Sequence, residues 1–492
     1  MPATGGRPNV LVVYSDDTDR ELLGCYGGEG LTPTVDRLAD EGIRFDGYHS
    51  AAPVCTPSRH CALTGQYASR SAGTLAEYPP GTVPNVLFES GVFREPEHHN
   101  LAAELSAAGY ATGMVGKWHQ GIDHDRFEPV AGDADPRDPE VAARLADNYD
   151  VVRESVRSTG FDYAESVYYD NPRQMAIPRE LRTHNMDWVT QGALDFLDAH
   201  GTGEDPFFLW MAPTCTHAPF GAEQLDADPR ATPSGYLDDA PDVQPNRERV
   251  KERVRGADAG AWGRDWLATW MDDGIAAVLD RLDELGVAED TLVIYTTDHG
   301  DLRGKGTVYE AGSRVPFVAR WPGTIEPGRP CTRLASNVDL APTVFDVAGV
   351  DPGHDHTVDG RSFAPLLTGE GEYRRESVYQ EAGSMRGVVT ADGFHYVATR
   401  FPPDLRGAVD DGARYSHHWQ RVDDPGEVRW GAGADYPAYF DRDQLYDLDA
   451  DPDERRNLAD DPRYADVLAR LRDELAAYSR DLPHAFGEFG GE

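Results

Sequence analysis

Short apolar segments recur along the chain, and segments with helical periodicity separate them. The clearest apolar runs lie at residues 9–14, 112–116, 207–212 and 291–297. Helical patterns lie at residues 33–42, 100–109 and 270–286. Continuous apolar strands that alternate with helices predict an α/β fold, in which a large, mostly parallel sheet is sandwiched between helices.

The pattern changes beyond residue 370. Shorter apolar runs at residues 377–380, 387–389 and 395–400 predict antiparallel strands, and residues 464–479 have the periodicity of a helix. A chain of 492 residues is long enough for two hydrophobic cores. We therefore expect a large domain over residues 1–370 and a smaller C-terminal α+β domain over residues 371–492.

Three segments lack apolar periodicity and predict irregular structure. Residues 221–264 are rich in Asp, Pro and Arg, and we interpret them as a surface excursion or a lid. Residues 123–147 have a similar composition, and residues 360–369 predict a loop that leaves the large domain. In contrast, residues 60–69 and 339–350 have helical patterns.

Polar residues that could take part in catalysis or bind a metal follow each of the four apolar runs. They are Asp16 and Asp17 after the first, Lys117 and His119 after the second, His217 after the third, and Asp298 and His299 after the fourth. Ligands of open α/β sheets bind beyond the carboxyl ends of the strands. We therefore expect all of these side chains to share one cleft.

The aspartates predict a divalent metal site. An isolated Asp-Asp pair at a strand end is more often a turn and a helix N-cap. Asp298 and His299 at the end of a second strand favour a metal, because three adjacent carboxylates need a compensating cation.

Cys55 and two lysines add a possible nucleophile and an anion site. A lone cysteine is more often a buried structural residue, but Cys55 begins the run Cys55-Thr56-Pro57-Ser58-Arg59 ahead of a predicted helix. Backbone N–H groups at a helix start favour an anion. The chain has only three lysines, and two of them, Lys117 and Lys305, lie in these clusters. A lysine there can bind an anion or give up its proton to a leaving group.

Composition and charge limit the classes of partner that we expect the protein to bind and the cellular compartment in which we expect it. The 46 basic and 86 acidic residues give a net charge of −40, which argues against nucleic acid and anionic membranes as partners. Acid excess with few lysines is typical of proteins from halophiles; a GC-rich genome would explain the lysines but not the charge. Five scattered cysteines do not predict a disulfide framework. The chain has no run of 18 apolar residues and no leader pattern, so we expect a soluble cytoplasmic protein.

The motifs together resemble the type I, formylglycine-dependent sulfatase family of the alkaline-phosphatase-like superfamily. The resemblance runs from near residue 7 to about residue 460, and its most specific parts are Cys55 to Arg59 and Gly116-Lys117-Trp118-His119. Weaker parts include Thr32 to Leu38, His217 to Phe220, Gly304 to Glu310 and Leu445 to Leu448.

The resemblance implies cofactors and roles. A maturation enzyme would convert Cys55 to Cα-formylglycine, whose hydrate attacks sulfur. Asp16, Asp17, Asp298, His299 and residue 55 would hold one divalent cation, most often Ca²⁺ in the family, with Mg²⁺ or Mn²⁺ as alternatives. Arg59 and the metal would favour the deprotonated form of one hydroxyl of the hydrate. Lys117, His217 and Lys305 would bind the sulfate oxygens and neutralise charge on the leaving alcohol, with Lys305 or His217 as the acid. His119 would help to release sulfate. The expected substrate is a sulfate ester of a small molecule or a carbohydrate.

One departure keeps other activities open. Many members of the family have Asn where this chain has His299, and His occurs there in relatives that cleave phosphonate or phosphate esters. A phosphonate monoester or phosphodiester hydrolase is therefore the main alternative. A metal-dependent phosphatase that uses an unmodified Cys55 is another. A non-catalytic binding protein would need a disrupted set of site residues, and none is disrupted.

The charge balance predicts a fold that depends on salt. Repulsion within a chain of net charge −40 weakens as screening shortens from about 30 Å at 0.01 M to about 3 Å at 1 M salt. We expect the melting temperature to rise steeply between these conditions when unfolding is followed by circular dichroism. A melting temperature that does not respond to salt would contradict the halophilic interpretation.

Overall fold

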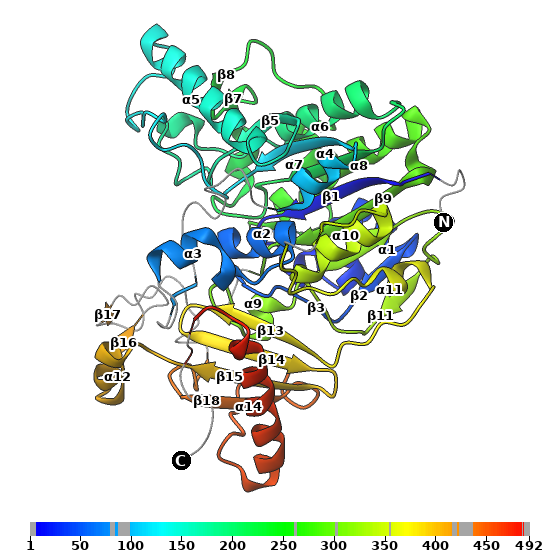
Figure 1. The fold of residues 1–492 in the computed structure, drawn as a ribbon. Coiled ribbons are helices and arrows are strands. Elements are labelled where there is room, and N and C mark those ends of the chain that lie inside the picture. The colour runs from blue at the N-terminus through cyan, green and yellow to red at the C-terminus, as the bar shows by residue number, and fades with distance from the viewer. Residues whose placement is uncertain are drawn as a thin grey trace.

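The computed structural model describes residues 6–78, 84–86, 99–259, 263–300, 304–353, 356–415, 421–422, 436–484 and 486. Its centre is an eight-stranded sheet with the order β11-β2-β10-β9-β1-β6-β4-β5 (Figure 1). The strands are β1 (Asn9–Ser15), β2 (Ile43–Phe45), β4 (Ala111–Lys117), β5 (Tyr163–Tyr168), β6 (Phe207–Ala212), β9 (Thr291–Thr297), β10 (Phe317–Arg320) and β11 (Arg329–Cys331). The predicted α/β class is confirmed.

The four apolar runs of the sequence are neighbours in this sheet. β1 pairs in parallel with both β9 and β6, and β6 pairs in parallel with β4. Only β10 is antiparallel to its neighbours, β9 and β2. The carboxyl ends of β9, β1, β6 and β4 consequently lie along one edge, as the alternation of strands and helices predicts.

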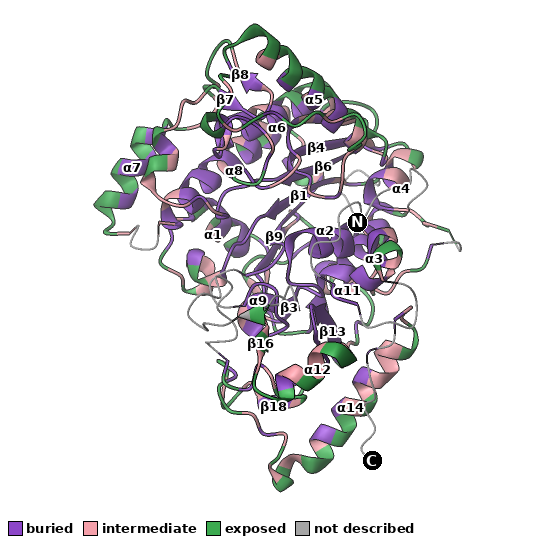
Figure 2. Ribbon diagram, turned by 90° about the vertical axis from the view of Figure 1, so that its left-hand side faces the viewer, coloured by how far each residue is buried: buried purple, intermediate pink, exposed green. Residues whose placement is uncertain are grey.

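Helices cover both faces of the sheet, which explains why the central strands β1, β6 and β9 are buried along almost their whole length (Figure 2). Val10, Val12 and Tyr14 of β1 face a core that also contains residues of α2 (Cys55–Thr64), α4 (Leu101–Ala107) and α10 (Leu340–Ala348). Leu11 and Val13 face the opposite core, with residues of α1 (Pro33–Asp40), α6 (Met186–His200), α7 (Arg247–Gly256) and α8 (Asp265–Leu285). None of the helices in the described parts of the chain is long and apolar enough to cross a membrane.

Several segments differ from the expectation of irregular structure. Helix α5 (Pro139–Arg157) begins within residues 123–147, α7 lies within residues 221–264, and α11 (Ala364–Thr368) lies within residues 360–369. The apolar signal of α7 is weak because its inward face is built largely on Val250 and Val254, one turn apart among charged residues. The first turns of α5 are also polar, so the apolar signal of this helix is weak as well. The side chain of Asp138 caps α5 by accepting from two backbone N–H groups.

The structure also places some helix and strand boundaries differently from the sequence prediction. The helix expected over residues 60–69 is α2, which begins at Cys55 and ends at Thr64, where Gly65 takes a left-handed conformation with φ of 71°. Strand β5 and helix α6 had no counterpart among the expected elements. Among the described residues, the large unit also contains the short helices α3 (Ala72–Glu77) and α9 (Glu310–Ser313).

The C-terminal part forms an antiparallel sheet with the order β13-β14-β15-β18, as its short apolar runs predict. Its strands are β13 (Ser377–Ala382), β14 (Met385–Thr390), β15 (Phe394–Thr399) and β18 (Asp443–Asp447), and its helices are α12 (Pro403–Asp410) and α14 (Ala465–Arg480). Leu471 and Leu475 of α14 share a core with Tyr379 of β13 and with Ala51 and Cys61 from the large unit. The C-terminal sheet is therefore packed against the region of α2. The domain boundary at residue 370 stays a prediction.

Candidate active site

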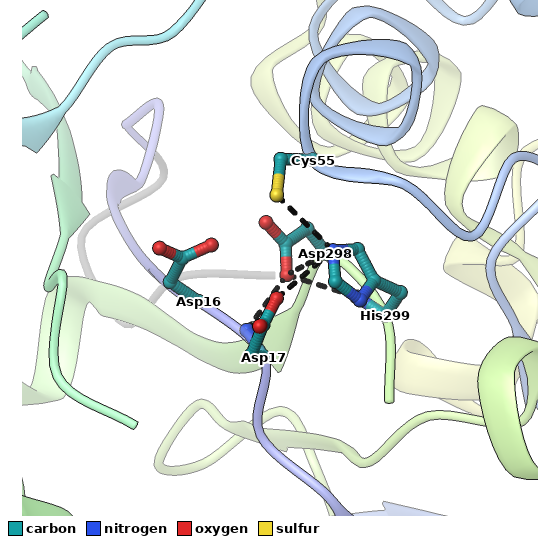
Figure 3. Close-up of side chains that lie close together, drawn as sticks. All are labelled: Asp16, Asp17, Cys55, Asp298 and His299. Carbon is teal, nitrogen blue, oxygen red and sulfur yellow. Dashed lines mark hydrogen bonds and ion pairs between the residues drawn. The ribbon is translucent and has the colours of Figure 1, made fainter. Parts of the chain in front are cut away.

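Five potential metal ligands meet at the carboxyl edge of the large sheet (Figure 3). Asp16 and Asp17 follow β1, Asp298 and His299 follow β9, and Cys55 is the first residue of α2. Their ligand atoms all lie within 4.8 Å of one another, and all five residues are buried. The structure thus brings together the whole set of metal ligands that the sequence predicts.

The register of two strands places these residues. β1 and β9 run in parallel with Ser15 opposite Thr297, so the residues that follow each strand emerge side by side. The N–H of Asp17 donates to Oδ1 of Asp298 across this junction at 3.0 Å. Asp17 has a left-handed backbone with φ of 55°, which is uncommon away from glycine and is often found at functional sites.

Each of the three carboxylates contacts a cationic side chain. Nζ of Lys117 lies 2.7 Å from both oxygens of Asp16, and Nζ of Lys305 lies 2.8 Å from both oxygens of Asp17. Arg59 donates to Oδ2 of Asp298 at 2.9 Å. Buried charges of one sign are costly unless they are paired, and here the pairs bring the predicted anion-binding residues into direct contact with the predicted metal ligands.

These charges shift the pKa values of the ligands in different directions. Burial would raise the pKa of Asp16, but the charges of Lys117, His217 and Arg59 outweigh it and hold the pKa well below 3.8. Burial dominates at Asp298 and raises its pKa to about 7, despite the nearby His299. At His299, burial lowers the pKa, but Asp298 and Asp17 overcome this effect and raise it to about 10. The cluster therefore favours added positive charge, which a proton or a divalent cation can supply.

The environment of Cys55 favours an anion. Its Sγ lies 3.3 Å from Nε2 of His299, and the residue is completely buried at the start of α2. Burial alone would raise the thiol pKa, but Lys117 and Lys305 lower it well below 9. A negatively charged group at position 55 is thus stabilised by two lysines and by the helix terminus.

His119 and His217 lie on the more accessible side of the site. Their side chains are 18% and 11% exposed, whereas those of Lys117 and Asp16 are fully buried. Nε2 of His217 lies 3.5 Å from Oδ2 of Asp17, and burial lowers the pKa of His217 although Asp17 acts in the opposite direction. Nε2 of His119 lies 3.2 Å from Oδ1 of Asp170. Both histidines can therefore transfer protons to or from a group that enters from this side.

Sequence reasoning missed three residues that shape the site. Asp170 and Asn171 follow β5, and Asn171 accepts a hydrogen bond from Nζ of Lys117 at 2.5 Å. The available signal was weaker than for the other strands, because Glu165 and Ser166 interrupt the apolar residues of β5. Asn337 is the third: it donates to the carbonyl of Ser58 in α2 at 3.1 Å and accepts from the N–H of Ala51 at 2.8 Å.

The donor set fits a hard divalent cation. Three carboxylates supply the oxygen ligands that Ca²⁺, Mg²⁺ and Mn²⁺ prefer, and imidazole is also a ligand for Mn²⁺ and Zn²⁺. The thiol of Cys55 is a soft donor in an otherwise hard set, and an oxygen at this position would match the other ligands better.

Comparison with known proteins agrees with the fold. The Sulfatase family model matches residues 8–350. Mouse steryl-sulfatase is 30% identical over 531 residues, which cover 94% of this chain and 80% of the relative. An N-acetylglucosamine-6-O-sulfatase of Bacteroides thetaiotaomicron is 26% identical, with 93% and 84% covered. The solved structure of the Agrobacterium radiobacter phosphonate monoester hydrolase is 19% identical, with a TM-score of 0.60 and 96% of each chain covered.

These relatives identify the chain as a hydrolase. Within that class the chain belongs to the sulfatase family, and it is an enzyme of that family.

The carboxylate cluster predicts one tightly bound divalent cation per chain. We expect elemental analysis of the purified protein to find one equivalent, and the variant Asp298→Ala to lose most of it together with activity. Asp272→Asn is a matched control, because Asp272 is also a buried carboxylate but accepts from the N–H groups of Thr34 and Val35, outside the cluster. Equal metal content and equal activity in wild type and Asp298→Ala would rule out the metal site.

Proposed function

We propose that this enzyme hydrolyses sulfate esters, with sulfated sugars as its substrate class. The observation that carries the proposal is the position of Cys55, at the start of α2, against the carboxylate and histidine cluster and in the field of Lys117 and Lys305. The relative named N-acetylglucosamine-6-O-sulfatase supports a sugar substrate.

Cys55 would act as Cα-formylglycine after oxidation by a maturation enzyme. The hydrated aldehyde supplies two hydroxyl groups on one carbon, one to attack sulfur and one whose proton is removed so that sulfate leaves and the aldehyde is restored. The motif Cys55 to Arg59 supports the modification. It would also replace the soft thiol with oxygen donors.

Asp16, Asp17, Asp298 and His299 would hold the cation together with residue 55, and we propose Ca²⁺, with Mg²⁺ and Mn²⁺ as alternatives. A bound divalent cation would supply charge stabilisation for sulfate oxygens and favour a deprotonated hydroxyl. Arg59 holds Asp298 in the ligand position and adds positive charge beside it. This arrangement needs no movement of the strands to complete the site.

The remaining residues divide between binding and proton transfer. Lys117 and Lys305 are positioned to bind sulfate oxygens, since each already contacts an anionic oxygen in the site. His217 or Lys305 would donate a proton to the leaving alcohol. His119, oriented by Asp170, would accept the proton from the second hydroxyl. The accessible side of the site, where both histidines lie, is where the alcohol half would enter and leave.

The charge of the site favours sulfate over phosphate. A sulfate monoester carries one negative charge, whereas a phosphate monoester is dianionic near pH 7. Beside the carboxylates Asp16, Asp17 and Asp298, the monoanion requires less compensation. The acidic composition supports one further proposal, that the enzyme works in the salt-rich cytoplasm of a halophile.

A phosphonate monoester or phosphodiester hydrolase is the second candidate. It is favoured by His299, where the resemblance departs from many sulfatases, and by the structural similarity to the phosphonate monoester hydrolase. Both activities would use the same residues and differ in the transferred group.

We predict that Cys55 carries formylglycine when the protein is produced together with a maturation enzyme. Peptide mass spectrometry of the segment around residue 55 should show the aldehyde or its hydrate, and Cys55→Ala should abolish turnover while leaving the melting temperature nearly unchanged. Cys61→Ala is the matched control in the same helix. A fully active preparation that contains only the thiol at position 55 would refute the mechanism and favour the unmodified-cysteine phosphatase.

We also predict that sulfate esters give the highest kcat/KM. Side-by-side kinetics on an aryl sulfate, a sulfated amino sugar, a phosphonate monoester and a phosphate diester would measure the preference. A clear preference for the phosphonate would assign the chain to the second candidate function and leave the assignment of the site residues intact.

A further inference from the structure

The segment of residues 304–313, which carries Lys305, lies between the two sheets of the molecule. On one side it joins the active site: Lys305 contacts Asp17, and the N–H of Gly306 donates at 2.9 Å to the carbonyl of Pro53, two residues before Cys55. The N–H of Ser50 also donates to the carbonyl of Ser313 at 2.6 Å. The backbone of this segment therefore sets the place of Lys305 relative to residue 55.

On its other side the same segment is held by strand β18 and by residues outside the strands in the C-terminal part of the chain. The N–H of Glu310 donates to Oε2 of Glu454 at 2.7 Å. The hydroxyl of Tyr309 donates to Oε1 of Gln444 in β18 at 2.7 Å, and its ring is stacked on that of Tyr436 with centroids 3.7 Å apart. Only four residues lie between Lys305 and Glu310, whose N–H makes the hydrogen bond to Glu454, and all four are buried.

Glu454 is itself firmly held. Nδ1 of His395, in β15, lies 2.5 Å from its Oε1, and the two residues are 1% and 0% exposed. Glu454 also has a left-handed backbone with φ of 53°, a conformation that persists only where the surrounding structure enforces it. The carboxylate therefore has little freedom to leave the N–H of Glu310.

The side chain of Glu310 completes a buried chain of charges. Its Oε1 lies 2.9 Å from Nε2 of His49, a residue of the large unit. Burial would raise the pKa of Glu310, but His49, Arg314 and His395 lower it to about 2, so this carboxylate stays ionised. A row of side-chain and backbone contacts thus links the large unit to the C-terminal sheet next to the Lys305 segment. It runs through His49, Glu310, Glu454 and His395.

We propose that Glu454, oriented by His395, is a positioning residue for Lys305. By fixing the N–H of Glu310, it holds segment 304–313 so that the ammonium group of Lys305 meets the substrate anion next to residue 55. The C-terminal sheet would then be part of the catalytic apparatus, although none of its residues needs to touch the substrate. The proposal rests on the proposed function only for the role of Lys305 in binding the anion.

A double-mutant cycle separates this role from a structural one. We expect Glu454→Ala to lower kcat/KM of the folded enzyme about ten- to a hundredfold, since small misplacements of catalytic groups have effects of this size. Glu454→Gln should recover most of the loss, because its amide oxygen can still accept from Glu310. In a Lys305→Ala background, Glu454→Ala should change kcat/KM by less than about twofold, because residues that act through one another are not additive.

Asp443→Asn is the matched control. Asp443 is a carboxylate of β18 that accepts from Tyr396 and Arg400 at 2.5 and 3.0 Å and pairs with Arg472, away from segment 304–313. Its replacement removes ion pairs from the same sheet and should leave kcat/KM within about twofold of wild type. If Glu454→Ala does not fold, His395→Phe, which removes the other partner of Glu454, replaces it in the cycle.

Hydrogen exchange tests the same idea without substrate. Amides of residues 304–313 should exchange at least about tenfold faster in Glu454→Ala than in wild type, while those of β1 and β9 keep their rates. Unchanged exchange in the segment, an unchanged kcat/KM, or an equal loss in the wild-type and Lys305→Ala backgrounds would overturn the proposal. The cycle uses whichever ester the wild type cleaves fastest, so an unexpected substrate preference would not affect this outcome.

Discussion

The structure depends on keeping three carboxylates together in a buried place. Asp16, Asp17 and Asp298 lie at the ends of two neighbouring strands with their oxygens within a few ångströms, where water cannot screen their repulsion. Each is offset by a cation that comes from a different part of the chain: Lys117 from the end of β4, Lys305 from the segment before α9, and Arg59 from α2. In the proposed mechanism, the lysines among these cations also bind the substrate anion, so stability and catalysis would rely on the same contacts.

The strand order of the sheet brings these charged groups together. The strand order β9-β1-β6-β4 places four carboxyl ends in a row, and the close approach of β4 to β6 allows Lys117 to reach Asp16. Gly116 makes this approach possible: its φ is 88°, and a Cβ at this position would lie 2.0 Å from the carbonyl oxygen of Ala212. A side chain there would push apart the two strands that carry Lys117 and lead to His217.

A second layer of buried polar contacts supports the first. Ser58 donates to the carbonyl of Asp298 at 2.6 Å, and Asn337 donates to Ser58, so that α2 is tied to the end of β9. Further out, the ion pair between Arg375 and Asp339 joins the chain that enters the C-terminal sheet to the start of α10. Buried pairs of this kind add little net stability but are costly to break, because the remaining partner is left uncompensated. They make the position of α2 and of residue 55 specific.

Local patterns in the sequence determined the class of fold, the four strand ends and the set of candidate metal ligands. Hydrophobic periodicity is a property of adjacent residues, and the motif Cys55 to Arg59 is contiguous. Only the tertiary structure decided which cation meets which carboxylate, since Lys117 and Lys305 lie 101 and 288 residues from their partners Asp16 and Asp17. The same holds for Asn171 beside Lys117, for Glu454 behind the Lys305 segment, and for helices such as α7 that bury only a narrow apolar stripe. The alternation of strands and helices indicates that the strand ends converge, but it does not specify which individual side chains from distant segments will be in contact.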